Sequence, residues 1–166
     1  MPKTSDKKKE IFRILEQDAR TTPQQIATQT GLSVSDVEKE IQKAEKSCAI
    51  LKYKTAINWE KLGEEQVWAL VEVKVQPQRD VGFDSIADRI ARFHQARSVY
   101  LVSGSYDLSV LVAGKNMREV ASFVSEKLAT LPSVQGTVTH FLLKKYKEDG
   151  LVLHEKEANQ RLPITL

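Results

Sequence analysis

Residues 98–114 read SVYLVSGSYDLSVLVAG, two apolar runs on either side of a short polar turn. Gly104 and Ser105 supply the bend, because both residue types favour tight turns between strands. The pattern predicts a β-hairpin, with Asp107 at the start of its second strand. A hairpin does not require a carboxylate there, so Asp107 either bonds to nearby backbone N–H groups or binds something else.

The segments around this hairpin complete a larger domain. Alternating apolar residues predict strands at 66–75 and 134–146. Apolar residues at helical spacing predict helices at 82–93 and 116–131. In the second helix we expect five residues to face inward: Met117, Val120, Ala121, Val124 and Leu128. The order βαββαβ predicts a ferredoxin-like fold, in which both helices cover one face of a four-stranded antiparallel sheet.

The other face of this sheet must be polar or find a partner. Leu108, Val110 and Val112 are expected to point toward the helices. The open face is then expected to carry the following residues: Trp68, Leu70, Glu72, Lys74, Asp107, Ser109, Leu111, Thr137, Thr139, Phe141 and Leu143. Such a mixture is too apolar for open water and suits a subunit interface in which a small polar ligand binds.

The first third of the chain has a helical period. Thr22 and Pro23 are placed as N-cap and first residue of a second short helix, which ends at Gly31. Ser33 or Ser35 caps a third helix. Three short helices, the last two joined by a tight turn, predict a helix-turn-helix. The fold class is therefore α+β.

We divide the chain into four parts. Residues 1–49 are expected to form a winged helix-turn-helix or helix-turn-helix DNA-binding domain, and 50–64 a linking strand and hinge. Residues 65–147 form the ferredoxin-like domain, which senses a ligand and forms oligomers, and 148–166 form a C-terminal tail.

Charge is distributed unevenly. Residues 1–62 hold 12 Lys and Arg against 9 Asp and Glu, whereas the rest holds 13 of each, so the excess of +3 lies in the first third. This asymmetry favours an anionic partner for that end. The single cysteine, Cys48, and the absence of a long apolar run or secretory signal predict a cytoplasmic protein that does not enter a membrane.

Catalytic and metal-binding patterns are missing from the sequence. His94, His140 and His154 are scattered, with no H-E-x-x-H motif and no second cysteine. Gly114-Lys115 lacks the other residues of a P-loop. We therefore expect neither an enzyme, nor a cofactor, nor a metal site.

The helix-turn-helix ILEQDARTTPQQIATQTGLSVSDV, the motif Gly104-x-Tyr106-Asp107-Leu108 and the later Thr137-x-Thr139 resemble the Lrp/AsnC family of transcriptional regulators. The resemblance covers roughly residues 6–147. It implies pairing of protomers through the sheet and an amino-acid effector near the turn of the hairpin. It implies effector-binding roles for five residues: Gly104, Tyr106, Asp107, Thr137 and Thr139. Without the resemblance, these are an ordinary turn and threonines that suit a pleated surface.

The resemblance also implies that the third helix binds double-stranded DNA. The candidate contacts are Thr22, Ser33, Ser35, Lys39, Gln42, Lys43 and Lys46. Lys7, Lys8, Lys9, Lys52 and Lys54 are further candidates for phosphate contacts. The family pattern usually has arginines where this chain has Glu40 and Gln42, and a glycine where it has Cys48. Because arginine is the better bidentate reader of guanine, these departures weaken the case for strong sequence readout.

The function predicted from the sequence is a sequence-specific, DNA-binding transcriptional regulator that responds to an amino acid or related metabolite. It is expected to be a homo-oligomer, a dimer at least and by preference a tetramer of dimers, that is, an octamer. The alternative is a non-enzymatic metabolite-sensing or assembly protein whose helix-turn-helix has lost specific DNA recognition. The acidic residues of the third helix favour that alternative, since residues 34–46 carry a net charge of −1.

Overall fold

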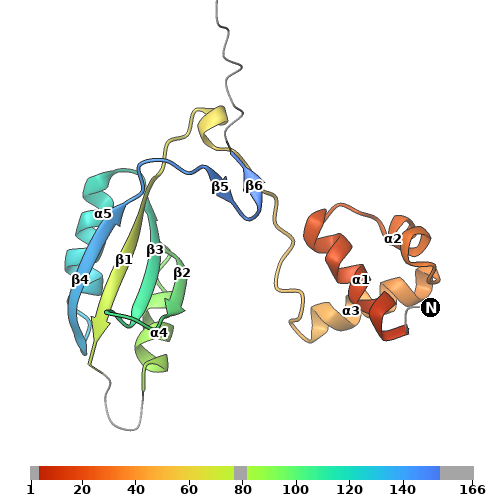
Figure 1. Cartoon of the computed structure of the whole chain (residues 1–166), viewed down its shortest axis with the longest axis horizontal. Coiled ribbons are helices and arrows are strands. Elements are labelled where there is room, and N and C mark those ends of the chain that lie inside the picture. The colour runs from red at the N-terminus through yellow and green to blue at the C-terminus, as the bar shows by residue number, and fades with distance from the viewer. Residues whose placement is uncertain (1–3, 77–81, 154–166) are drawn as a thin grey trace, which may run out of the picture. The chain divides into compact units, whose positions relative to one another are not determined.

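The computed structural model describes residues 4–76 and 82–153. The chain divides between Ile57 and Asn58 into two compact units (Figure 1). This division falls inside the segment that the sequence predicts to be a linker.

Unit 1 is a three-helix bundle. Its helices are α1 (Thr4–Gln17), α2 (Pro23–Thr30) and α3 (Val34–Lys46). Ile11, Ile26 and Val37, one from each helix, are fully buried and form its core together with Ala27. The predicted helix-turn-helix is confirmed, with α2 and α3 as the paired helices.

Local capping sets the bounds of α2 and α3. The side chain of Thr22 accepts a hydrogen bond from the backbone N–H of Gln25, whose side chain bonds back to the N–H of Thr22. Gly31 ends α2 in the left-handed region, at φ 65°. Ser33, and not Ser35, caps α3 by accepting from the N–H of Asp36.

Unit 2 has the predicted βαββαβ order. Its main elements are β1 (Val67–Val75), α4 (Asp84–Ala91), β2 (Ala96–Leu101), β3 (Leu108–Gly114), α5 (Met117–Phe123) and β4 (Val134–Phe141). The sheet order is β2-β3-β1-β4 with all neighbours antiparallel, and α4 and α5 lie on the same side of it (Figure 1). The ferredoxin-like prediction is therefore confirmed. A single turn of 3-10 helix, η1 (Glu60–Leu62), precedes β1.

The core of unit 2 fills the space between the sheet and its helices. Val71, Val110 and Ile90 are fully buried there. The rings of Phe93 and Phe123 meet edge to face with their centroids 5.4 Å apart. Because α4 and α5 cover this face, the predicted inward direction of Leu108, Val110 and Val112 is confirmed.

The inward face of α5 differs in part from the prediction. Met117 is 56% exposed, and Ala121 is exposed, whereas Phe123 is buried. After Phe123 the helix widens into a π-turn, η2 (Val124–Leu128), in which the N–H of Ala129 donates to the carbonyl of Val124 at 2.8 Å. The extra residue in this turn brings Leu128 to the buried face five residues after Phe123. Met117 and Ala121 precede the turn, so it does not account for their exposure.

The predicted face of β4 is wrong by one residue. Thr137, Thr139 and Phe141 pair with Val73, Val71 and Ala69, which are buried against the helices. Directly paired residues share a face, so these three lie on the helix-covered side. Val138 and His140 lie on the open face instead, paired with Glu72 and Leu70.

The segments flanking the sheet also differ from expectation. Residues 51–58 form neither helix nor strand in this chain, although a strand was predicted. A strand requires a partner, and the described part of the chain provides none for them. At the other end, β5 (Lys147–Glu148) and β6 (Leu151–Val152) form a small hairpin across the predicted boundary between the ferredoxin-like domain and the tail. The Asn58 side-chain amide donates to the carbonyl of Leu153 at 3.3 Å, linking the hairpin to the start of unit 2.

Candidate functional site

The solvent-facing side of α3 carries a polar stripe. Ser35, Lys39, Gln42 and Lys46 follow one another at intervals of three or four residues and are all exposed. Lys43 lies beside this stripe and is also exposed. Lys39, Gln42, Lys43, Lys46 and Ser47 line one shallow hollow on the surface. The structure thus brings together four of the predicted DNA-contacting residues.

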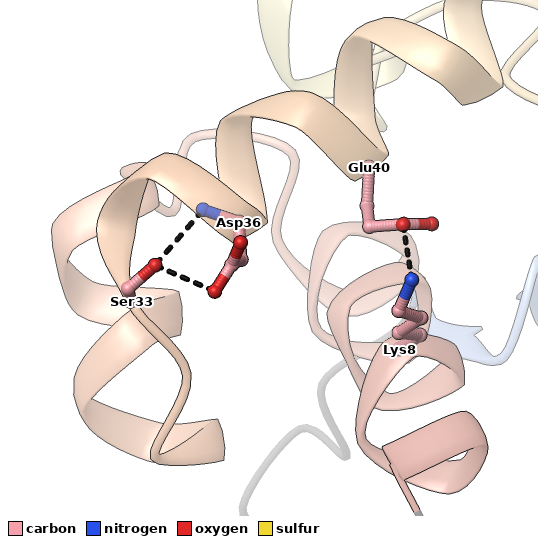
Figure 2. A network of polar contacts seen from close by, with 4 residues as sticks. All are labelled: Lys8, Ser33, Asp36 and Glu40. Carbon is pink, nitrogen blue, oxygen red and sulfur yellow. Dashed lines mark hydrogen bonds and ion pairs between the residues drawn. The ribbon is translucent and has the colours of Figure 1, made fainter.

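Two acidic residues of α3, Glu40 and Asp36, are bound by neighbouring side chains of unit 1. The Lys8 ammonium on α1 forms an ion pair with Glu40 (Figure 2). The hydrogen bond from Lys8 lowers the pKa of Glu40, so the carboxylate remains ionised and directed toward α1. Asp36 binds the Ser33 hydroxyl, which donates at 2.7 Å. Glu38 and Glu45 remain exposed on the side of the stripe opposite Lys43, so these two acids flank the stripe and do not lie within it.

Glu45 has a partner in the linker. The Tyr53 hydroxyl donates to Glu45 Oε1 at 2.8 Å. Desolvation of the phenol raises the pKa of Tyr53, and the hydrogen bond to Glu45 raises it further, so the phenol keeps the proton that it donates. This contact fixes the first residues of the linker to the C-terminal end of α3.

Other predicted DNA contacts have structural roles in this unit. Thr22 and Ser33 are engaged as helix caps. Lys8 is engaged by Glu40. Ser35, in contrast, is exposed at the first turn of α3, where hydroxyls and backbone N–H groups can reach phosphates.

The turn between β2 and β3 is built around Asp107. It spans residues 102–107, and the N–H of Val102 closes it by donating to the carbonyl of Asp107 at 2.9 Å. The Asp107 carboxylate accepts from the N–H of Val75 at 2.8 Å and from the Lys74 ammonium at 3.3 Å. The hydrogen bond from Val75 lowers the pKa of Asp107, with Lys74 acting in the same direction. Asp107 thus remains an anion that is bound by Val75 and Lys74 of the neighbouring strand.

The predicted effector residues come together only in part. Gly104 and Tyr106 share the turn with Asp107, and a Cβ placed on Gly104 meets nothing within 4 Å. Thr137 pairs with Val73 on the side of β1 that is away from β3, so it lies two strands from the turn. Thr139 pairs with Val71 on the same side. Within one protomer, Thr137 and Thr139 therefore do not share a site with Asp107.

Sequence reasoning missed the partners that hold these charged groups. Lys8 and Glu40 are 32 residues apart, as are Val75 and Asp107. The Lys145 ammonium lies 3.3 Å from the centre of the Trp68 ring and pairs with Glu148 at 2.7 Å. No local pattern marks the Lys8–Glu40, Val75–Asp107 and Lys145–Trp68 contacts, because each forms only when distant segments meet. Among the described residues no group of His, Cys, Asp and Glu is arranged to hold a metal ion.

Two family models match this chain. The model of the Lrp/AsnC ligand binding domain matches residues 68–152. The chain belongs to the Lrp/AsnC family. A winged helix-turn-helix DNA-binding model matches residues 4–47, which contain all three helices of unit 1. The Lrp/AsnC assignment thus covers both units, and the resemblance noted in the sequence is confirmed.

Relatives and solved structures agree with this assignment. The chain is 46% identical to the uncharacterized HTH-type transcriptional regulator YugG of Bacillus subtilis, over 98% of this chain and 99% of that protein. It is 30% identical to the HTH-type transcriptional regulator FL11 of Pyrococcus abyssi, over 83% and 88%. The crystal structure of the leucine response regulatory protein LrpA of Mycobacterium tuberculosis superposes with a TM-score of 0.73 at 25% identity, over 90% and 99%.

These findings establish the general function. The protein is a helix-turn-helix transcriptional regulator of the Lrp/AsnC family, with DNA binding in unit 1 and a ligand-binding domain in unit 2. No helix in the described ranges has the length and apolar character needed to cross a bilayer.

Proposed function

We propose that this protein binds specific duplex sequences through α3 and that an amino acid or related metabolite, bound at the 102–107 turn, changes its assembly. The observation that carries the DNA part is the stripe of Ser35, Lys39, Gln42 and Lys46, beside which Lys43 adds a third ammonium. In a dimer these lysines and Ser35 supply roughly 6–8 phosphate contacts. Affinity for DNA then falls by about 10³–10⁵ between 50 and 200 mM salt.

The effector part of the proposal rests on the environment of Asp107. Its carboxylate is ionised, and Lys74 already places one ammonium 3.3 Å from it. A ligand ammonium is the same chemical group and fits the same carboxylate. The Val75 N–H is an internal competitor for one carboxylate oxygen, so the ligand is expected to replace Lys74 rather than Val75. Gly104 and Tyr106 would lie beside the ligand in the same turn. Thr137 and Thr139 would contact the ligand only if a second protomer brought its own β4 to this turn.

Assembly is the third part of the proposal. The open face of the sheet presents Trp68, Leu70, Leu111 and Val138, of which Val138 is 53% exposed. Apolar residues on an uncovered sheet face favour pairing with a second copy. We propose a dimer through this face and an octamer built from four dimers. A ligand shifts such an equilibrium only as far as it binds one assembly better than another.

A cytoplasmic location and a regulatory rather than catalytic role complete the proposal. Their support is the set of relatives, which are named as transcriptional regulators. The alternative, a sensing or assembly protein without specific DNA recognition, is not favoured by the DNA-binding family that matches unit 1.

The deciding experiment is fluorescence anisotropy with the full chain at 50 and 200 mM salt. The probes are duplex DNA from upstream of the protein's own gene and a random duplex of equal length. The proposal expects tighter binding to the upstream duplex at both salt concentrations. Equal affinity for the two duplexes, or no binding at 50 mM, would support the alternative.

A second experiment addresses the effector and the assembly. Thermal shift and light scattering are measured with each of the twenty amino acids. We expect at least one amino acid to raise the melting temperature and change the particle mass. A monomer at micromolar concentration would contradict the assembly part, and twenty unchanged melting curves would contradict the effector part.

A further inference from the structure

The hollow on α3 combines three ammonium groups with one amide. Of its five lining residues, Lys39, Lys43 and Lys46 are point charges, and Ser47 uses its hydroxyl to donate to the carbonyl of Ala44 at 3.2 Å. Gln42 is exposed and is the lining side chain that has both a donor and an acceptor in one plane. Base edges are read by such fixed pairs of groups, whereas phosphates require only charge.

Charge is arranged in two columns on the two sides of Gln42. At about 100° per residue, Lys39 and Lys46 lie on one side of it, one turn before and one turn after. Glu38 and Glu45 lie on the other side at the same spacing. Phosphates attract the lysine column and repel the acidic one, so the helix enters a groove with the lysines toward a backbone. Gln42, at the boundary, then faces the base edges.

Glu40 is not available for reading bases. Its carboxylate is held by Lys8, on the side of α3 that faces α1 (Figure 2). Glu45 is held in turn by Tyr53. Of Glu40 and Gln42, only Gln42 therefore has an exposed side chain, and its head group is an amide.

We propose that Gln42 reads an adenine in the major groove, with its amide oxygen accepting from N6 and its amide nitrogen donating to N7. This is the bidentate geometry that a glutamine amide shares with adenine, as an arginine shares it with guanine. Lys39, Lys43 and Lys46 hold the neighbouring phosphates. The inference rests on the proposed function, namely that α3 enters the major groove of duplex DNA.

Selection from a random duplex library tests this with the full chain. The arms are the native protein, Gln42→Ala, Gln42→Arg and the matched control Glu38→Ala, which alters an exposed residue one turn earlier. We expect the native protein to enrich a motif with one fixed A·T pair in each half-site. Gln42→Ala loses the preference at that pair alone, Gln42→Arg changes it to G·C, and Glu38→Ala keeps it.

Anisotropy on the selected duplex gives the size of the effect. Replacing the A·T pair by G·C weakens binding of the native protein by about 5- to 150-fold, the range for one bidentate base contact. The same replacement leaves the affinity of Gln42→Ala nearly unchanged. Because Gln42 is exposed, far-ultraviolet circular dichroism is expected to show all four proteins folded.

The possible results distinguish a failure of adenine reading by Gln42 from a failure of specific DNA binding. If the native protein selects a motif and both Gln42 variants select the same one, the reading of adenine by Gln42 is wrong while specific DNA binding stands. If the native protein enriches no motif, the proposed function fails, and the inference fails with it; the native arm shows this before any variant is compared.

Discussion

Asp107 accepts a hydrogen bond from the backbone N–H of Val75, with 2.8 Å between Oδ2 and the nitrogen. The last pair between β1 and β3 is Val73 with Leu108, and the N–H of Asp107 donates to the carbonyl of Val73 at 3.1 Å. Val75 lies beyond that pair on the same edge of β1, so its N–H has no partner on β3, and the Asp107 carboxylate supplies the acceptor. The residue singled out as an effector contact therefore also supports the end of β1.

This double role predicts how substitutions of Asp107 behave. Asp107→Ala leaves the Val75 N–H without its acceptor and is expected to lower the melting temperature of unit 2 by several degrees. Asp107→Asn retains an oxygen that can accept from Val75 but loses the charge that attracts an ammonium. It is expected to melt close to the native protein and to lose the response to effector. A retained response in the asparagine variant would remove Asp107 from the effector site.

Acid titration gives a second prediction for the same residue. The pKa of Asp107 is lowered in the folded protein, chiefly by the hydrogen bond from Val75. The ionised Asp107 carboxylate therefore contributes its full share to the free energy of unfolding above the ordinary aspartate pKa of about 3.9. That contribution is lost as the pH falls through the lower pKa that Asp107 has in the folded protein. Urea unfolding of unit 2, measured from pH 6 to 2, should therefore show a steeper loss of stability for the native protein than for Asp107→Asn. Parallel curves would contradict this.

Releasing Lys8 should change the salt dependence of DNA binding. Glu40→Gln removes the charge that holds Lys8 and allows its ammonium to contact a phosphate. One additional phosphate contact per protomer, two in the dimer, steepens the plot of log affinity against log salt by about 1.8. Glu38→Gln removes the same charge without releasing a lysine, so its slope should equal that of the native protein. Anisotropy at four salt concentrations distinguishes the two variants.

Cys48 should be replaceable by glycine with a gain in stability. Cys48 has φ 56°, in the left-handed region, and its side chain is exposed. A residue with a Cβ is disfavoured there by about 1–2 kcal/mol, while glycine adds entropy to the unfolded chain. We expect Cys48→Gly to raise the free energy of unfolding of unit 1 by roughly 0.5–1 kcal/mol. The control Cys48→Ala retains a Cβ, so its free energy of unfolding in urea should stay close to that of the native protein. Equal free energies of unfolding for the glycine and alanine variants would contradict backbone strain at residue 48.

The two units should respond separately to changes in their cores. Ile26 is fully buried in unit 1, and its core shares no residue with that of unit 2. Ile26→Ala is expected to cost about 2–5 kcal/mol, and Ile26→Val about 0.5–1.5 kcal/mol. DNA binding should weaken in the alanine variant while the particle mass in light scattering stays that of the native protein. A change in mass would show that assembly depends on unit 1.

The sequence alone determined the features that depend on short-range pattern. The helical period in the first third, the alternation of strands and helices after residue 65 and the cap residues Thr22 and Gly31 specify the elements and their order. The choice of Ser33 over Ser35 as the cap of α3 came from the structure. The order βαββαβ then leaves few topologies, which is why the fold and the family were predicted correctly.

Only the tertiary structure decided which charges pair and which face each residue occupies. Thr139 and Val138 are equally acceptable on either side of a strand, and the pairing of Thr139 with Val71 places it against the helices. Glu40 resembles an exposed acid until α1 brings Lys8 to it. Periodicity is a property of neighbouring residues, whereas register and ion pairs are fixed by contacts between segments far apart in the chain. The polar stripe of α3 was therefore visible in the sequence from its helical spacing, whereas the pairing of Glu40 with Lys8 was decided only when the helices packed.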